Sequence, residues 1–327
     1  MKREIFKHIK KFLPLIGIIL LVYLIYSLGL EDIKNAFLSI HPIFIILSLS
    51  LTVPRIFIRN YSWQIILKEQ KINISYWNSL KIFLIGFFYC SMTPGFVGHV
   101  IRIPYMKEYT NEPYGKLFIN TLIEVLVRTY ALYTIIIIGL IVLIQQTKLI
   151  FNLVLLWIFV IIIPIIIVIY FLEKHRGEKT FLILIKYFIP KSFKQDLKTF
   201  VTTFYKDFPR FRKLIIPYII GGFTWILIFF QEYFIVIALN LDIPFFDFLC
   251  FISIANVIGF VPITVAGMGT RDATAVFIFT TLYPVTGAEI LVVSLLGFIL
   301  TDVFTGLIGF FVTLNEEKKS FNLFFNK

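Results

Sequence analysis

Long apolar stretches alternate with short polar segments along the whole chain. A helix needs about 20 apolar residues to cross about 30 Å of hydrocarbon. Six stretches meet this requirement: 12–30, 42–66, 118–144, 150–172, 214–239 and 289–314. The pattern therefore predicts six full transmembrane helices.

Two further apolar stretches, 77–100 and 245–283, are interrupted by Pro and Gly near their centres. Broken backbone is tolerated at membrane depth only where protein buries it or a polar cavity receives it. We therefore expect each stretch to form a re-entrant hairpin of two short helices. The alternative is a pair of tilted full spans for each stretch, which would leave the loops on the same sides.

Composition supports a membrane protein. Of the 327 residues, 59% are hydrophobic and 15% charged, whereas soluble domains contain about 45–50% apolar and about 25% charged residues. Two cysteines are too few for a disulfide framework. We expect an all-α polytopic membrane protein in which 1–327 forms a single integral membrane domain.

The net charge of +12 gives the orientation. Basic residues crowd the N-terminal tail (1–11), the segment 173–213, which holds eleven Lys and Arg, and the C-terminal tail (315–327). By the positive-inside rule these segments and both termini lie in the cytoplasm, at the cytoplasmic (cell) membrane. Retention of basic residues on the cytoplasmic side then accounts for the positive net charge, so no nucleic acid is expected as a partner.

This orientation makes the two hairpins enter from opposite sides. The hairpin 77–100 would enter from the cytoplasm and 245–283 from outside, in halves 12–172 and 214–314 that form an inverted repeat. Transporters built in this way place the substrate near the midplane, where broken helices meet. Between the halves, Phe at helical spacing predicts an amphipathic helix in the 173–213 loop, lying in the membrane interface.

Each hairpin carries Pro, then Gly, then Arg. A helix that resumes after such a break has N–H groups without intrahelical partners, which favours an anion, and the Arg adds a planar fork of donors. The alternative is that Pro and Gly only permit turns and close helix packing. The expected substrate-binding residues are Pro94, Gly95, Gly98, His99, Arg102, Pro262, Gly267, Gly269, Arg271 and Asp272.

With these residues the chain resembles the transmembrane region of lysylphosphatidylglycerol synthases and related stand-alone, flippase-like membrane proteins. Their motifs read Pro-Gly-x-x-Gly-Glu-x-x-Arg and Pro-x-x-x-Gly-Gly-x-Gly-x-Arg-Glu. The resemblance implies movement of an anionic or modified lipid between leaflets, without the soluble aminoacyl-tRNA-dependent acyltransferase domain of bifunctional members. Further positions that fit the family are Arg59, Trp63 and Glu124, and positions that depart from it are His99, Ala266, Asp272 and Arg128.

Ionisable residues inside the predicted spans need a partner or a function, because each costs at least about 2.5–3.5 kcal/mol at membrane depth. Glu124 and Arg128 are one helical turn apart and can pair. Glu232 is placed to bind Arg271 or to face a polar cavity, and Asp302 has no cation nearby in sequence. The supporting intramembrane charges are Arg59, Glu124, Arg128, Glu232 and Asp302.

We therefore expect lipid translocation, with an anionic phospholipid or a polyprenyl phosphate as the partner and with no metal or cofactor. An embedded head-group transferase related to phosphatidylglycerol lysyltransferases is one alternative, with Glu124, Glu232, Asp272 or Asp302 as its base. A non-catalytic membrane partner of a separately encoded synthase or transferase is another. His99 is either a neutral hydrogen-bonded residue or a proton carrier.

Overall fold

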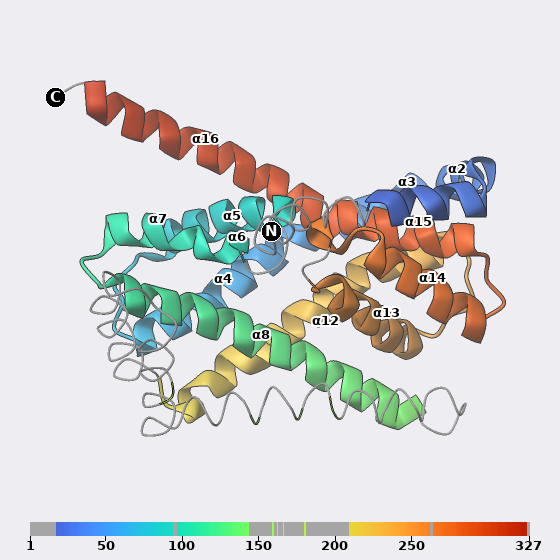
Figure 1. The fold of residues 1–327 in the computed structure, drawn as a ribbon, viewed down its shortest axis with the longest axis horizontal. Coiled ribbons are helices and arrows are strands. Elements are labelled where there is room, and N and C mark those ends of the chain that lie inside the picture. The colour runs from blue at the N-terminus through green and yellow to red at the C-terminus, as the bar shows by residue number, and fades with distance from the viewer. Residues whose placement is uncertain are drawn as a thin grey trace, which may run out of the picture. The chain divides into compact units, whose positions relative to one another are not determined.

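The computed structural model describes residues 18–93, 97–143, 209–261 and 264–325, with single helical positions at 159, 162, 166 and 180. All regular structure in these ranges is helical, which confirms the all-α fold (Figure 1). The chain divides into two compact units. The first comprises Met1–Asn60, Trp77–Arg102 and Phe223–Lys327, and the second Tyr61–Tyr76 and Ile103–Gly222.

Four helical stretches are long and apolar enough to cross a membrane: Pro42–Glu69, Tyr114–Leu143, Phe211–Ala238 and Gly287–Glu316. They confirm the spans predicted at 42–66, 118–144, 214–239 and 289–314. Their elements are α3 (Pro42–Ser50), α4 (Thr52–Glu69), α8 (Tyr114–Leu143), η2 (Phe211–Leu214), α12 (Ile215–Ala238), α15 (Gly287–Phe298), η4 (Ile299–Val303) and α16 (Phe304–Phe325).

The other two predicted spans are less fully covered. The stretch 12–30 is described from Ile18 as the short helix Ile18–Leu28, followed by α2 (Leu30–Leu38). The stretch 150–172 lies outside the described residues, apart from single positions, and so does most of the predicted amphipathic loop 173–213.

The first hairpin breaks where its motif predicts. It comprises α5 (Tyr76–Met92), α6 (Val97–Val100) and the start of α7 (Arg102–Tyr109). A Cβ added to Gly98 would lie 2.3 Å from the backbone nitrogen of Cys90, and one added to Gly86 would lie 2.4 Å from the Arg102 side chain. The chain after the break therefore returns along α5. Pro94 and Gly95 lie outside the described residues.

The second hairpin breaks between α13 (Phe245–Gly259) and α14 (Thr270–Leu282), with the short turn η3 (Val265–Gly267) between them. Gly267 and Gly269 have φ of +76° and +85°, a region in which a Cβ is strained. Ala266 shares that region, with φ of +50°. Gly267 also packs on Gly259, where a Cβ would come within 2.9 Å of the Gly259 Cα. Pro262 lies outside the described residues.

The hairpin arms are short. At about 1.5 Å per residue, the 17 residues of α5 and the 15 of α13 extend about 25 Å and about 22 Å, less than the ~30 Å of hydrocarbon. These lengths favour re-entrant hairpins over paired full spans. Re-entrance, the opposite sides of entry and the division into inverted halves stay predictions.

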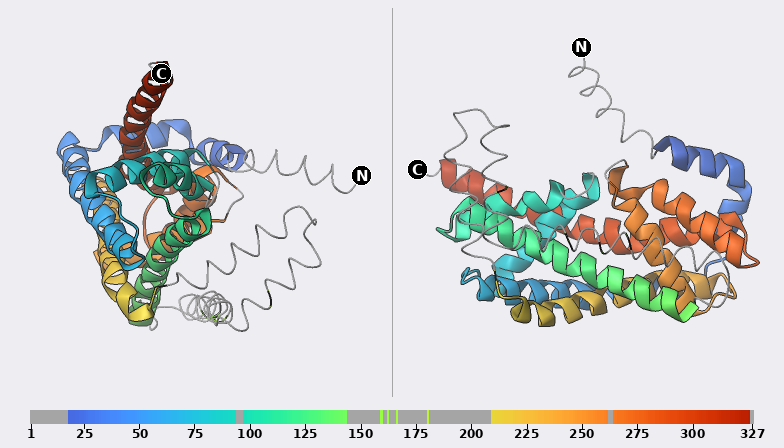
Figure 2. Two further views of the ribbon diagram at one scale, coloured as in Figure 1. Left: turned by 90° about the vertical axis from the view of Figure 1, so that its left-hand side faces the viewer. Right: turned by 60° about the horizontal axis from the view of Figure 1, so that its bottom comes forward.

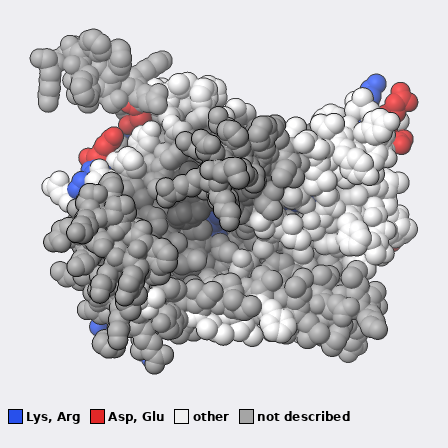
Figure 3. All heavy atoms as spheres, viewed as in Figure 1, with Lys and Arg blue, Asp and Glu red and all other residues white. Residues whose placement is uncertain are grey.

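One long helix joins both hairpins in the first unit. It runs from α15 through the π-helical turn η4 into α16. The second hairpin packs on α15 through α14, and α2 also packs on α15. Both contacts can be followed in Figures 1 and 2. In Figure 3, charged side chains gather where α2 lies, and the neighbouring surface over α15 is almost wholly uncharged.

The first hairpin packs on α16, the other half of this long helix. A Cβ on Gly306 would lie 2.8 Å from the Ser91 hydroxyl, and one on Gly309 would lie 2.2 Å from the Leu84 carbonyl oxygen. Phe88 and Phe310 pack beside them, with ring centroids 5.3 Å apart. Small residues let membrane helices approach closely. The turn η4 therefore lies between the places where the two hairpins pack.

We expect Gly309→Ala to destabilise the protein by about 1–3 kcal/mol, because the new methyl group collides with the backbone of α5. The measurement is the thermal unfolding midpoint of the purified protein in detergent. Gly222→Ala is the matched control, since its Cβ would sit 3.9 Å from Ala131 in ordinary contact and Ala is the better helix former. Equal midpoints for the two variants would contradict the packing described for α16.

Candidate functional site

The first hairpin holds two arginines against one aromatic ring. Arg102, the first residue of α7, is 0% exposed, and its guanidinium carbon lies 5.1 Å from the centroid of Phe83. Arg59, from α4, lies 4.8 Å from the same centroid and 5.4 Å from that of Phe87. Cation–π contacts fix both guanidinium groups. A guanidinium group is a planar cation of the kind that binds phosphates and carboxylates.

Glycine positions allow this arrangement. Arg102 reaches back across Gly86, where any Cβ would collide with its side chain. Gly98 and His99 belong to α6, and the His99 side chain is buried. The structure therefore brings Arg59, His99 and Arg102 of the predicted site into one unit.

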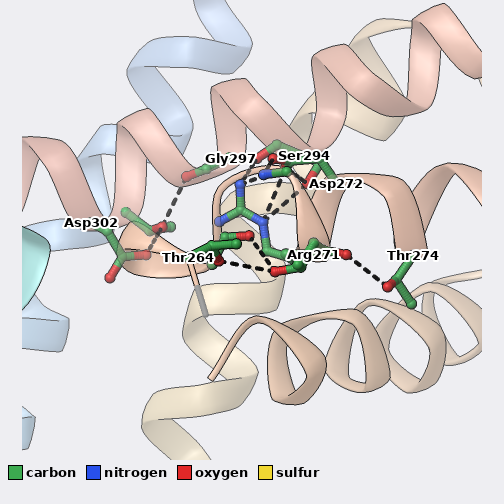
Figure 4. A network of polar contacts seen from close by, with 11 residues as sticks. Thr264, Arg271, Asp272, Thr274, Ser294, Gly297 and Asp302 are labelled. Carbon is green, nitrogen blue, oxygen red and sulfur yellow. Dashed lines mark hydrogen bonds and ion pairs between the residues drawn. The ribbon is translucent and has the colours of Figure 1, made fainter. Parts of the chain in front are cut away.

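The arginine of the second hairpin is already paired. Arg271 Nη2 donates to Asp272 Oδ1 at 2.7 Å and to the Ser294 carbonyl oxygen at 3.2 Å, and Nε donates to Ser294 Oγ at 3.1 Å. Ser294 Oγ in turn donates to Asp272 Oδ1 at 2.6 Å. Figure 4 shows this network joining the start of α14 to α15. The pair is buried and anchors the resumed helix.

Asp272 also occupies the N-terminus of α14. The Gly269 N–H donates to Asp272 Oδ2 at 2.8 Å, so the carboxylate satisfies a donor that we expected to be open to an anion. Thr270 Oγ1 lies 3.1 Å from Thr264 Oγ1 and donates to the Gly267 carbonyl at 3.2 Å, closing the turn before the helix. One guanidinium nitrogen, Nη1 of Arg271, donates no hydrogen bond among the described residues.

Arg55 reaches the π-helical turn. Its Nη2 donates to the Thr301 carbonyl at 2.8 Å and to Thr305 Oγ1 at 2.9 Å. A π-turn changes which carbonyls find partners within the helix, and such turns often occur at functional sites. Asp302 stands in the same turn and accepts a hydrogen bond from Thr301 Oγ1 at 3.0 Å.

Glu232 lies between these two networks. Its side chain covers Gly297, where an added Cβ would lie 2.8 Å from Glu232 Cγ. Arg271, Asp302, Arg55 and Asp272 all act on it electrostatically. The structure thus brings Glu232 near Arg271 as one of our alternatives expected, but the described residues form no ion pair between them.

The second unit contains the two predicted intramembrane charges not yet described, Glu124 and Arg128. Glu124 and Arg128 lie one turn apart on α8, and the Glu124 side chain is buried. In the same unit Trp63 Nε1 donates to Asn120 Oδ1, and Asn120 Nδ2 donates to Gln70 Oε1, each at 2.7 Å.

Sequence reasoning missed several of these partners. Ser294 and Asn120 are polar residues within apolar stretches, and that signal could have identified them. Phe83 is one of 38 Phe, and nothing local distinguishes it. Within the described ranges, no group of three or more His, Cys, Asp or Glu is placed to hold a metal ion.

We expect Arg271→Gln to destabilise the protein by about 3–5 kcal/mol, because it leaves Asp272 as a buried carboxylate without its cation. The double variant Arg271→Gln/Asp272→Asn should recover part of this loss by removing the uncompensated charge. Thermal midpoints of the three proteins test the coupling. Equal midpoints for the single and the double variant would contradict a stabilising ion pair.

A family model described as Lysylphosphatidylglycerol synthase TM region matches residues 13–309. The match covers both hairpins, three of the four long apolar helices and most of the fourth. A search of curated proteins gave no match. The chain therefore belongs to the lysylphosphatidylglycerol synthase TM region family and is a membrane protein of lipid metabolism or transport.

Proposed function

We propose that this protein moves an anionic lipid between the leaflets of the cytoplasmic membrane, with both termini in the cytoplasm. The observation that carries the proposal is the pair of buried guanidinium groups of Arg59 and Arg102 on the Phe83 ring. The substrate class is a lipid with one phosphate in its head group, either a phospholipid or a polyprenyl phosphate.

The physical obstacle to translocation is the head-group charge. A charge at the bilayer centre costs at least about 2.5–3.5 kcal/mol unless a partner offsets it. Two guanidinium groups that are already fixed on one ring lower the cost of ordering their side chains when an anion binds. The acyl chains need no such partner, because they can stay in the hydrocarbon along an apolar outer surface.

The second hairpin supplies a further cation, Arg271 of α14, which binds Ser294 of the long helix formed by α15, η4 and α16. Arg271 keeps Nη1 free of hydrogen bonds among the described residues while its other nitrogens hold Asp272 and Ser294. Gly259 packs on Gly267 and on this arginine, since a Cβ on Gly259 would lie 3.1 Å from the Arg271 Cβ. In this proposal both hairpins line one translocation route, and the head group meets a cation at Arg102 and another at Arg271.

Entry of a head group requires movement. Arg102 is fully buried, so an anion reaches it only after the first hairpin opens. The contact between Gly98 of α6 and Cys90 of α5 is a suitable place for this opening. The backbones of the two helices touch there, because Gly98 has no side chain to lie between them. Two discrete arrangements of a hairpin are what alternating access needs.

We expect Arg102→Gln to lower the rate of lipid movement at least tenfold, because it removes one of the two cations that offset the head-group charge. The measurement is the transfer of fluorescent phosphatidylglycerol between leaflets of proteoliposomes. Arg102→Lys should recover only part of the rate, since an ammonium keeps the charge but not the planar fork.

Arg212→Gln is the control, because Arg212 is an exposed cation at the start of the Phe211–Ala238 span. It should move lipid like the unsubstituted protein. Size-exclusion profiles and thermal midpoints show whether each variant is folded. If the folded unsubstituted protein moves no more lipid than empty liposomes do, the proposed translocation function is wrong. A new covalent lipid product in extracts of expressing cells would instead support the transferase alternative.

A further inference from the structure

Glu232 is a buried carboxylate without a hydrogen bond to the described residues. Its side chain is 5% exposed, and Oε2 accepts no hydrogen bond among the described residues. The neighbouring Gln231 is fixed instead, since its Nε2 donates to the Ser48 carbonyl at 2.8 Å and to Thr52 Oγ1 at 2.9 Å. An ionised carboxylate in such a place would lose hydration without a hydrogen bond from the described residues to replace it.

Charged groups from three other elements act electrostatically on Glu232. Arg55 comes from α4, Arg271 and Asp272 from the start of α14, and Asp302 from the turn η4. The helix α15 presents no charge at this point, because Gly297 lies directly under the Glu232 side chain. Figure 4 shows Arg271 and Asp302 on either side of Gly297 along that helix.

These five groups do not balance when all are ionised. Three carboxylates face two guanidinium groups, which leaves one negative charge buried among membrane helices. Asp272 is held ionised by two guanidinium hydrogen bonds and a backbone N–H. Asp302 accepts a hydroxyl hydrogen bond and is only partly buried. Glu232 Oε2 accepts no hydrogen bond from the described residues. Of the three carboxylates, Glu232 is therefore the one whose protonation costs the least free energy.

We propose that Glu232 is a proton-binding site that takes up one proton with each anionic head group and releases it on the other side of the membrane. The coupling rests on the proposed translocation, whereas the binding site itself does not. The proton comes from water, forms an O–H bond on the Glu232 carboxylate and leaves again to water, so nothing is oxidised or reduced.

The helix α4 provides the physical link between proton and lipid. Arg59 faces the first hairpin, and Arg55, one turn earlier, binds the π-turn and acts on Glu232. A head group arriving at Arg59 adds negative charge close to this cluster. A protonated Glu232 offsets that charge, so each ligand favours binding of the other, and the coupling is reciprocal.

Infrared difference spectroscopy tests the proton site directly. A protonated carboxyl group has a C=O band that is distinct from carboxylate bands and shifts in deuterium oxide. We expect such a band near neutral pH in the unsubstituted protein and in Glu31→Gln, which removes an exposed glutamate of α2. The band should be absent in Glu232→Gln, a near isostere of the neutral acid. Absence of the band from the unsubstituted protein, or its survival in Glu232→Gln, would overturn the proposal.

Transport in proteoliposomes tests the coupling. If one proton accompanies one singly charged lipid, each pH unit across the membrane should support a leaflet ratio of about tenfold for fluorescent phosphatidylglycerol. Glu232→Gln should show no dependence on the gradient, while Glu31→Gln keeps it. If the unsubstituted protein moves lipid to the same leaflet ratio with and without the pH gradient, the proposed coupling is wrong. A carboxyl band without any lipid movement would refute translocation but retain the proton site.

Discussion

Charge neutrality inside the hydrocarbon is the constraint on which the rest of this structure depends. The first unit buries arginines and carboxylates contributed by helices far apart in the chain, and each must be offset where water is scarce. The carboxylate of Asp272 offsets the charge of Arg271, and the oxygen atoms of Thr301 and Thr305 accept hydrogen bonds from Arg55. These contacts tie α14 and α4 to the single long helix formed by α15, η4 and α16.

That helix organises the unit because its surface changes along its length. Its α15 half offers Ser294 and Gly297 to the second hairpin and to Glu232. Its α16 half offers Gly306 and Gly309 to the first hairpin. The π-turn between them brings carbonyl and hydroxyl oxygens to Arg55. Close packing without side-chain bulk and polar contacts without water thus occur on one element, which is how membrane helices associate when burial of apolar surface cannot drive them together.

The two Pro/Gly/Arg motifs look alike in sequence but end in different environments. Arg271 has a carboxylate next to it in the chain, and the resulting pair closes the N-terminus of α14. Arg102 has no acidic neighbour in sequence and stacks on Phe83 together with Arg59. The first motif therefore places its arginine on an aromatic ring beside a second arginine, and the second places its arginine in a nearly neutral network. An asymmetry of this kind suits a route in which a head group is bound at one point and its charge is balanced at another.

The sequence by itself determined the elements. Apolar length gave the four confirmed spans, Pro and Gly gave both helix breaks, and the motif residues gave the family. Only the tertiary structure decided which charges meet, because partners such as Arg55 and Thr301 are 246 positions apart and no local pattern relates them. Phe83 contacts two arginines, and Glu232 Oε2 accepts no hydrogen bond from the described residues, for the same reason. Helix packing sets the neighbours of a side chain in a membrane, whereas local sequence sets only the helix that carries it.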